Sequence, residues 1–178
     1  MIVRLERPHD RDVSLDVERK AFESESEADI VRAVRDEGGS FALVADDDGV
    51  IVGHVQLSVV RVGADAVAGL GPIGVLPSRQ RSGIGRALIE AACAESASRG
   101  LPAVVLLGDP DFYPRFGFRP AAEFGLRNPF AGDDSHGFVI QEEDFMLMPL
   151  DTRARDLSGA VRWHPAFGEP VEAPEGGS

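Results

Sequence analysis

The chain has little of the residue types that mark disulfide-bonded and nucleic-acid-binding proteins. It contains one cysteine, Cys93, so no disulfide can form within it. Lys20 is its one lysine, and its 178 residues carry a formal net charge of −12. Affinity for nucleic acid comes largely from neutralising phosphates, so such an acidic chain is a poor candidate for that role. Its electric field favours cationic or neutral partners, such as an amine.

Long apolar runs are also absent. No stretch approaches the roughly 18–20 apolar residues that cross a bilayer, which argues against a membrane protein. The opening residues, MIVRLERPHD, include no apolar segment ahead of a small-residue cleavage site, so the sequence predicts no secretory signal. Together with the lack of disulfides, these features predict a cytoplasmic protein.

Candidate metal ligands are few. No group of histidine and cysteine residues has the spacing of a metal site, so we expect no metal. The acidic run Asp46–Asp48 precedes Gly49 and lacks the downstream glutamate of a calcium-binding loop. We interpret it as the turn of a β-hairpin.

Apolar periodicity predicts one mixed α/β domain, in which strands come first and a strand–helix–strand unit follows. We expect strands at Ile2–Leu5, Ser40–Ala45, Val50–Arg61, Val67–Val75, Ala103–Leu107 and Phe145–Leu150, with a short one at Phe118. We expect helices at His9–Phe22, Glu25–Glu37 and Gly83–Arg99, with a short one around Pro110–Phe116. The tail is rich in proline, glycine and glutamate, so we interpret residues 151–178 as a C-terminal extension whose end, Pro170–Ser178, is disordered.

The segment Leu70–Ala87, with the sequence LGPIGVLPSRQRSGIGRA, carries the clearest chemical signal. A strand runs into a loop that opens a helix through Gly83 and Gly85. Amides at a helix start lack intrahelical partners, and together with the helix dipole they form a ready anion site. The glycines let a phosphate approach the backbone. Three arginines add positive charge nearby: Arg79, Arg81 and Arg86.

The strand before this loop is interrupted by residues that disturb a regular ladder. They are Gly69, Gly71, Pro72 and Gly74. Such a pattern predicts a bulge, an irregular ladder or the close approach of another molecule to the backbone.

Other phosphate-binding motifs fit the segment poorly. A Walker loop needs a lysine followed by serine or threonine, and neither is present. A dinucleotide fingerprint, G-x-G-x-x-G/A, needs a small residue three positions after its second glycine. After Gly85 the small residue is Ala87, one position too early. The fingerprint also needs an acidic residue about twenty positions on, where the chain has Val105. A glycine-rich helix start without a ligand stays open as the alternative.

Two motifs in this order resemble a known family. Gln80–Gly85 (QRSGIG) matches the Q/R-x-x-G-x-G/A signature of the GNAT superfamily of N-acetyltransferases, and a strand ending in IGVLP precedes it, as is typical of the family. Downstream, Phe112–Phe118 (FYPRFGF) matches the F-Y-x-x-x-G-F segment of the same family. The resemblance spans Ile2–Leu150 and is strongest to a small bacterial branch of predicted acetyltransferases.

This resemblance implies a fold and a reaction. The expected fold is a largely antiparallel sheet flanked by helices, with a V-shaped split between two parallel central strands, Val67–Val75 and Ala103–Leu107. Residues 1–150 are then an acyl-CoA N-acyltransferase domain that transfers an acetyl group from its cosubstrate, acetyl-CoA, to a primary amine. A non-catalytic acyl-CoA-binding sensor and the transfer of a longer acyl chain stay open as alternatives.

The resemblance also implies roles for individual residues. The strand at Ile73, Gly74 and Val75 holds the pantetheine arm, and the amide of Val75 faces the thioester carbonyl. The backbone of the next loop and helix start binds the pyrophosphate: Arg81, Ser82, Gly83, Ile84, Gly85, Arg86 and Ala87. Tyr113, the single tyrosine, lies against the cofactor and protonates the departing thiolate or donates it a hydrogen bond. An aromatic side chain that only packs in the core is the alternative for this residue.

The acceptor side is the least defined. Asp109 lies near the expected position of a general base, but a carboxylate there also suits a cap for the following helix. Glu23 and Glu25 are expected to be solvated, and His54, on a strand face, to be structural. A base is unnecessary if water takes the proton from an amine of modest pKa. The segment Gly108–Asp111 is shorter than in the family, which leaves open whether the acceptor is a small molecule or a protein or peptide amine.

Direct attack of the amine on the thioester is expected rather than an acyl-cysteine intermediate. Cys93 has no histidine nearby in the sequence to activate it. The sequence is compatible with a monomer or a homodimer.

Overall fold

The structure is a computed structural model that describes residues 1–135 and 137–171. Its centre is an 8-stranded sheet in the spatial order β1-β2-β3-β4-β5-β7-β6, with β8 paired to β3. The strands are β1 (Ile2–Leu5), β2 (Phe41–Asp47), β3 (Val50–Val62), β4 (Asp65–Val75), β5 (Ala103–Leu107), β6 (Arg119–Pro120), β7 (Phe145–Pro149) and β8 (Val161–Arg162). Every pair is antiparallel except β4 with β5, which run parallel. The predicted fold class is confirmed.

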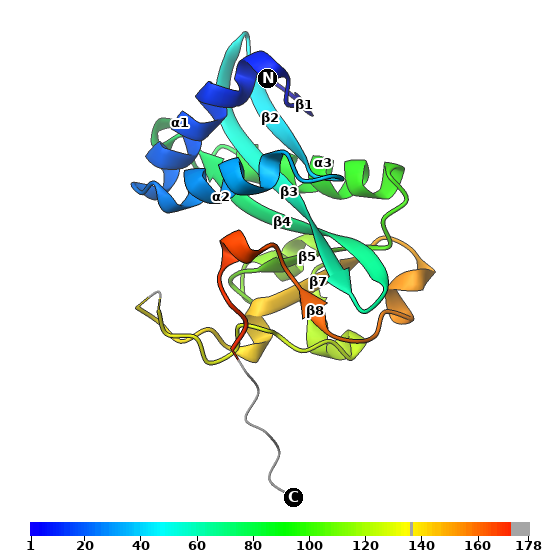
Figure 1. The fold of residues 1–178 in the computed structure, drawn as a ribbon. Coiled ribbons are helices and arrows are strands. Elements are labelled where there is room, and N and C mark those ends of the chain that lie inside the picture. Colours follow the sequence, from blue (N-terminus) through cyan, green and yellow to red (C-terminus); the bar gives the residue numbers. More distant parts are fainter. Residues whose placement is uncertain (136, 172–178) are drawn as a thin grey trace, which may run out of the picture.

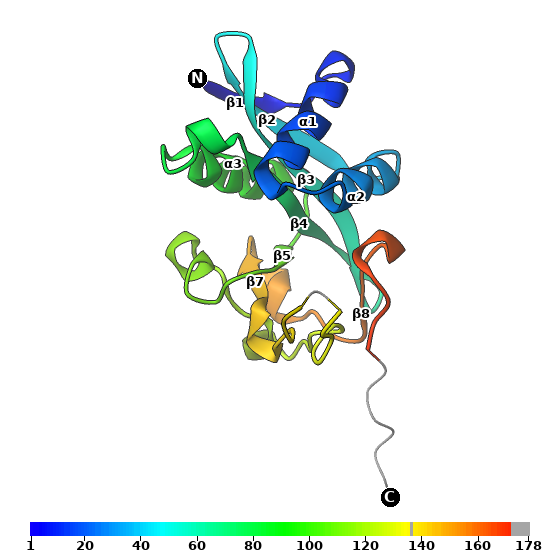
Figure 2. The same cartoon turned by 90° about the vertical axis from the view of Figure 1, so that its left-hand side faces the viewer.

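In the described part of the chain, three α-helices cover the two faces of this sheet. They are α1 (Arg11–Phe22), α2 (Ser26–Arg35) and α3 (Ile84–Ser98). Figures 1 and 2 show α1 and α2 over one face and α3 against the opposite face. Within the same residues, no helix is long and apolar enough to cross a membrane.

The observed elements start and end within a few residues of the predicted ones. Pro8–Asp10 forms a 3-10 turn first, so α1 begins at Arg11. The strand predicted at Phe118 lies at Arg119–Pro120 instead. Gly117 adopts a φ of 95°, and Phe118 enters the core before the chain pairs with β7.

The acidic run between β2 and β3 forms the predicted hairpin turn. Asp48 and Gly49 have φ values of 53° and 89°, and a tight turn between twisted strands requires such positive values. The side chain of Asp46 accepts a hydrogen bond from the amide of Gly49 at 2.8 Å. It also accepts one from Arg4 at 2.9 Å. The interpretation of this run as a turn is therefore confirmed.

Close packing against β3 fixes the position of α3. A Cβ atom on Gly53 would come within 2.9 Å of Ile84 Cγ2 and 3.0 Å of Leu88 Cδ1. Both of these side chains are buried, and protein interiors leave little room for them to move. The first turn of α3 is thereby held against the middle of the sheet, next to the end of β4.

The parallel strands β4 and β5 diverge shortly after they meet. Within the described strands they pair at Ala68 with Val104 and at Gly69 with Val105, and the ladder ends there. β4 continues alone on this side through residues Leu70–Val75. This divergence is the predicted V-shaped split, which Figure 2 shows between the upper and lower halves of the sheet.

The irregularity predicted for β4 is present. The pairing of β3 with β4 shifts register between Val55 and Leu57. Val55 is opposite Ile73 and Leu57 is opposite Leu70, so β4 has one more residue than β3 in this interval. The predicted bulge therefore lies at the start of the split.

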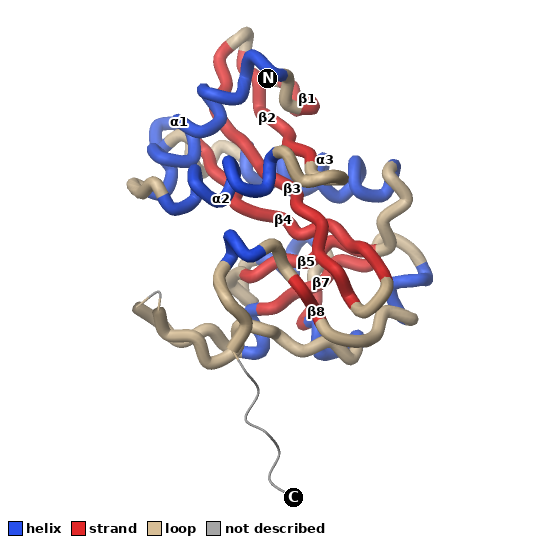
Figure 3. The backbone as a smooth tube through the Cα atoms, viewed as in Figure 1, coloured by secondary structure: helices blue, strands red, loops and turns tan. Residues whose placement is uncertain are grey.

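The chain beyond Leu150 contributes to the folded core. Val161 lies in β8, which extends the sheet beside the far end of β3. Leu157 and Val161 are buried among side chains of β3, β4, β5 and β7. Trp163 packs on Phe145, with ring centroids 6.4 Å apart. The short helix that follows, Pro165–Phe167, lies beside α2, as Figure 3 shows.

These contacts bear on the expected boundary after residue 150. They join the C-terminal extension to the sheet, so we expect it to be needed for stability. Of the end expected to be disordered, Pro170–Ser178, residues 172–178 lie outside the described residues.

Ending the chain after Leu150 should destabilise the domain strongly. The truncation removes the burial of Leu157, Val161 and Trp163, and each large apolar side chain contributes roughly 1.5–3 kcal/mol. We expect a loss of about 5 kcal/mol, against a total of roughly 5–15 kcal/mol for a typical domain. Urea unfolding of the two chains measures this loss in the free energy of unfolding. A chain ending at Val171 is the matched control and should unfold like the full chain, whereas equal stability of all three chains would contradict the expectation.

Candidate functional site

The loop between β4 and α3 leaves a group of backbone amides that have no hydrogen-bond partner among residues 1–135 and 137–171. Arg81 and Gly83 adopt left-handed φ values of 58° and 86°, and Ser82 Oγ donates to the carbonyl of Arg79 at 2.5 Å. In α3, the amide of Ala87 donates to the carbonyl of Gly83 at 3.0 Å and so begins the helical ladder. The amides ahead of Ala87 therefore point out of the helix start together with the positive end of its dipole. This arrangement can hold a phosphate.

Gly85 has no neighbour that would exclude a side chain. Apart from its own helix backbone and chain neighbours, a Cβ atom there would meet no atom of the described residues within 4 Å, and its φ lies outside the left-handed region. Neither packing nor backbone conformation within the chain therefore requires glycine at this position. Gly83 differs, because its φ of 86° favours glycine by itself. A molecule that approaches this backbone from outside would account for Gly85.

An open pocket of about 460 Å³ lies in front of this helix start. Its walls are the end of β4 at Val75, the first residues of α3 and the short helix Tyr113–Phe116. Four arginines line it: Arg79, Arg81, Arg86 and Arg115. The pocket is thus locally positive in a chain of net charge −12, which suits an anionic ligand.

These arginines are not equally available. Arg79 pairs with Asp47, and Arg86 pairs with Glu90 at 2.8 Å. Arg81 forms no ion pair with any of residues 1–135 or 137–171. The positive charge that the sequence predicts for this loop is therefore partly neutralised at two positions and free at Arg81.

The end of β4 turns one backbone amide into the split. The amide of Leu76 donates to the carbonyl of Val52 at 3.0 Å, toward β3. Successive residues of a strand direct their amides to opposite edges, so the amide of Val75 points away from β3 and into the split. Gln80 Nε2 donates to the carbonyl of Val75 at 3.2 Å, which ties the loop to the strand end.

Tyr113 occupies the other wall of the split, at the end of β5. Its ring fills the space that a side chain on Gly108 would need, and it meets Phe118 edge to face at a centroid distance of 5.7 Å. Within the described residues its hydroxyl makes no hydrogen bond. Burial raises the pKa of Tyr113, and the negative charge of Asp109 raises it further. The phenol therefore stays protonated at neutral pH and can donate a hydrogen bond.

Asp109 shapes the turn that presents Tyr113. Its Oδ1 accepts the amide of Asp111 at 2.8 Å, and its carbonyl accepts the amides of Phe112 and Tyr113 at 3.0 and 3.3 Å. The carboxylate thus closes a turn ahead of the helix Tyr113–Phe116 and does not cap it, because the N-cap residue is Phe112 and receives no side-chain hydrogen bond. The short helix predicted around Pro110–Phe116 is correspondingly reduced to a single turn, Tyr113–Phe116.

A buried acid–histidine pair lies on the opposite face of the sheet, under α1. Glu18 and His54 are each 0% exposed, and Glu18 Oε1 lies 2.6 Å from His54 Nδ1. Burial raises the pKa of Glu18, and the hydrogen bond with His54 opposes that effect. On its other side, His54 Nε2 lies 3.8 Å from Glu6 Oε1.

Comparisons with known proteins show the family to which the chain belongs. The family model described as the acetyltransferase (GNAT) family matches residues 8–118. The "Uncharacterized N-acetyltransferase YhbS" of Escherichia coli (strain K12) is 33% identical over 171 residues, which covers 94% of this chain and 98% of that protein. The chain belongs to the GNAT family.

Two solved GNAT structures resemble this one along nearly its whole length. YhbS from Escherichia coli in complex with CoA has a TM-score of 0.83 at 33% identity and covers 93% of this chain and 91% of its own. A GNAT acetyltransferase from Brucella melitensis in complex with acetyl-CoA has a TM-score of 0.74 at 31% identity, with coverage of 94% and 97%. The predicted family is confirmed, and these two complexes bear out the predicted cosubstrate of the family.

The pair under α1 is the part of this GNAT chain that sequence reasoning missed. His54 was expected to be structural, and Glu18 was not singled out. The available signal was helical spacing: Ser14 and Leu15 precede Glu18 by four and three positions, and all three are buried on one face of α1. A glutamate on a buried helix face requires a partner.

The other candidate residues have ordinary structural roles. Glu25 is an exposed partner of Arg19 at 2.7 Å, and Glu23 ends α1 in the left-handed region with a φ of 54°. Burial, with a smaller effect of Glu90, raises the pKa of Cys93 to about 11, so its thiol is a poor nucleophile at neutral pH. Among the described residues, no group of three His, Cys, Asp or Glu could hold a metal ion.

Alanine substitutions of Gly85 and Gly83 test two different statements about the helix start. The first tests whether a side chain has room, and the second tests whether the left-handed backbone requires glycine. Gly85→Ala should stabilise the protein by roughly 0.5–1 kcal/mol, because alanine favours a helix and meets no atom there. Gly83→Ala should destabilise it by about 1 kcal/mol or more, because its φ is left-handed. Denaturant unfolding without added ligand measures both changes. The same sign for both variants would contradict this description of the loop.

Proposed function

We propose that this GNAT protein is an acetyl-CoA-dependent N-acetyltransferase that acetylates a primary amine by direct attack on the thioester. The observation that carries the proposal is the convergence of two sets of unpaired amides on one pocket. The start of α3 offers several, and the split edge of β4 offers that of Val75. The CoA and acetyl-CoA complexes of the two similar GNAT proteins support the same cosubstrate here.

The proposed cosubstrate site uses mainly backbone. The pyrophosphate is held by the loop and helix start, from Arg81 through Ser82, Gly83, Ile84, Gly85 and Arg86 to Ala87. Gly83 and Gly85 leave the approach open, and Arg81 supplies a cation without an ion pair. The pantetheine arm lies along Ile73, Gly74 and Val75, where β4 has no partner strand on the split side. The arm thus replaces the missing strand with its own amide groups.

The proposed chemistry places charge stabilisation and thiolate departure on opposite walls of the split. When the amine attacks, the thioester oxygen becomes negative and accepts a hydrogen bond from the amide of Val75. The C–N bond forms, the C–S bond breaks, and the thiolate accepts a hydrogen bond or a proton from Tyr113. The raised pKa of Tyr113 keeps the proton on the phenol until the sulfur becomes negative.

The acceptor is defined here only as a primary amine. The net charge of −12 attracts cations at long range, which fits an amine that arrives as its ammonium form. A cytoplasmic location, where acetyl-CoA and such amines meet, stays a prediction from the sequence.

Acetyl-CoA affinity measured by calorimetry tests the cosubstrate site. The double variant Gly83→Asp, Gly85→Asp places two negative charges at the helix start and should weaken binding by on the order of 100-fold or more, through repulsion and loss of the open approach. The control Ala94→Asp, Ala97→Asp adds the same charge at exposed positions of the same helix and should bind like the wild type. No binding by the wild type would refute the proposal.

Tyr113→Phe tests the leaving-group role. We expect turnover of an active amine to fall by on the order of 10–10³-fold while acetyl-CoA affinity changes little, because the ring that packs in the core is kept. Release of free CoA thiol across a panel of primary amines measures turnover. Full activity of this variant would remove Tyr113 from the mechanism, and binding without transfer to any amine would favour a sensor.

A further inference from the structure

Buried polar atoms without partners gather in the layer between β3 and the helices α1 and α2. Within the described residues, five such atoms belong to this layer: Glu18 Oε2, Glu27 Oε2, Arg35 Nε, His54 Nε2 and Gln56 Oε1. Buried polar groups in folded proteins nearly always have partners, so such a concentration of exceptions needs an explanation. A purely structural Glu–His pair would satisfy both of its ends, whereas here neither Glu18 Oε2 nor His54 Nε2 has a hydrogen-bond partner among the described residues.

The inner end of this layer reaches the strand where acetyl transfer is proposed. A Cβ atom on Gly74 would come within 2.8 Å of Glu18 Oε2 and 3.1 Å of Ala21 Cβ. The carboxylate of Glu18 therefore lies directly on the backbone of β4. Gly74 is covalently joined to Val75, whose amide points into the split. Glu18 Oε2 thus lies beside the backbone at which amine and thioester would meet.

His54 connects this inner end to the outer one. Its Nδ1 lies 2.6 Å from Glu18 Oε1, and its Nε2 lies 3.8 Å from Glu6 Oε1. The second distance exceeds a hydrogen bond, and one bridging water or a small side-chain movement would close it. An imidazole can accept a proton on one nitrogen and release one from the other.

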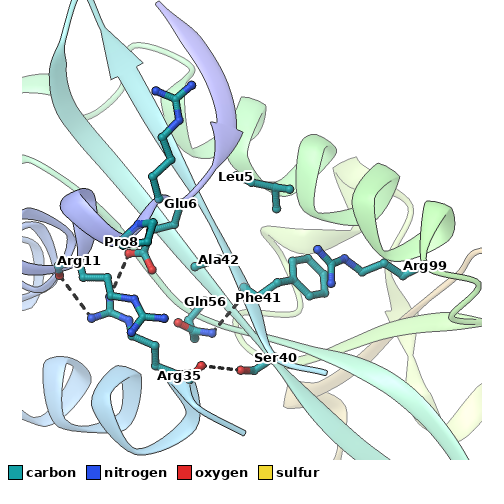
Figure 4. A pocket seen from close by; sticks show the side chains of 11 residues that line it. Leu5, Glu6, Pro8, Arg11, Arg35, Ser40, Phe41, Ala42, Gln56 and Arg99 are labelled. Carbon is teal, nitrogen blue, oxygen red and sulfur yellow. Dashed lines mark hydrogen bonds and ion pairs between the residues drawn. The ribbon is translucent and has the colours of Figure 1, made fainter. Parts of the chain in front are cut away.

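Glu6 brings the outer end to solvent. It lines a pocket of about 250 Å³ together with Arg35 and Gln56, and Figure 4 shows the three side chains gathered there. The carboxylate of Glu6 pairs with Arg35 Nη2 at 2.9 Å. The Glu6 side chain is 7% exposed, whereas His54 behind it is fully buried. The pocket is therefore the point at which this polar line meets water.

An alkylamine acceptor needs a route for a proton. At neutral pH it is an ammonium ion, and its nitrogen cannot attack until one proton has left. We propose that Glu18, His54 and Glu6 form a proton path from the acceptor to the solvent pocket. This proposal rests on the proposed acetyltransferase function. Glu18 takes the proton on Oε2, beside Gly74, His54 passes one on from its other nitrogen, and Glu6 releases it to solvent.

Bonds and protons balance in this scheme. The ammonium gives one proton to the path, and the neutral amine then forms the C–N bond while the C–S bond of acetyl-CoA breaks. A second proton leaves the nitrogen as the amide forms. Tyr113 gives its proton to the sulfur and regains that second one. The products are the amide, free CoA and one proton released at Glu6.

The surroundings of Glu18 suit a group that takes up and releases a proton. Burial raises its pKa, and the hydrogen bond and the charge of His54 oppose this rise. The charge of Glu27 on α2 adds to the rise, and the backbone of Gly74 makes a smaller opposing contribution. Across the path, Arg35 of α2 pairs with Glu6. A carboxyl group with a raised pKa exchanges its proton closer to neutral pH than an exposed one, as a general base requires.

The test compares Glu18→Gln with the wild type on two acceptors. One is the primary alkylamine that the wild type acetylates fastest, and the other is hydroxylamine, which is small and mostly neutral near neutral pH. With the alkylamine, kcat/KM should fall by on the order of 10²-fold near neutral pH. The loss should shrink as the pH approaches the pKa of the amine, because hydroxide then removes the proton. With hydroxylamine the loss should stay below about threefold.

The pH profile separates a proton path from a structural role. The wild-type kcat/KM for the alkylamine should level off above the raised pKa of Glu18, whereas that of Glu18→Gln should keep rising up to the pKa of the amine. The control is Ser14→Ala, which removes a buried hydroxyl one turn earlier in α1. This hydroxyl donates a hydrogen bond to the backbone carbonyl of Asp10 at 3.1 Å. Its profile should match the wild type. An equal loss with both acceptors at every pH, or no loss with the alkylamine, overturns the path.

A second variant keeps the test decisive if Glu18→Gln fails to fold. Glu6→Gln keeps an oxygen for Arg35 but cannot carry a proton, and it should show the same loss confined to the alkylamine. A folded Glu6→Gln protein with the wild-type profile overturns the path. If the wild type acetylates neither acceptor, the acetyltransferase proposal itself fails, and the proton path fails with it.

Discussion

The whole arrangement depends on the point at which β4 and β5 stop pairing. Two bridged positions hold the strands together, and beyond them the backbone of β4 has no partner on one side among the strands that the structure describes. Unpaired backbone groups are costly unless water or a ligand satisfies them. Because β4 turns directly into the start of α3, the same short segment exposes strand amides and helix-start amides on one pocket. Packing at Gly53 then keeps that helix start in place.

Much of this could be predicted from the sequence because it is local. The turn at Asp48 and Gly49 follows from residues that tolerate positive φ, and the bulge in β4 follows from its glycines and proline. The helix start was identified from Gly83 and Gly85, whose spacing relative to the preceding strand needs no tertiary information. The family motifs then supplied the position of Tyr113, which periodicity alone does not give.

The features that could not be predicted from the sequence depend on contacts between distant parts of the chain. Glu18 and His54 are 36 residues apart. Helical spacing can place Glu18 on the buried face of α1, but nothing local identifies a histidine on β3 as its partner. The role of Asp109 was undecided because a cap and a base need the same side chain, and the fold gives it a third role, in which its carboxylate accepts the amide of Asp111 at 2.8 Å and closes the turn before the helix. The tail was taken for an extension from its polar composition, although a few apolar residues within it complete the core.

The position of β8 also determines the order in which the protein can finish folding. Arg162, in β8, donates to the carbonyl of Gly63 across 99 residues of sequence, at 3.5 Å. During synthesis from the N-terminus, the far end of β3 therefore leaves the ribosome long before the strand that covers it. Until β8 arrives, that end is an open strand edge of the kind that recruits other chains. The last strand in the described part of the chain, β8, thus also protects the first half against aggregation.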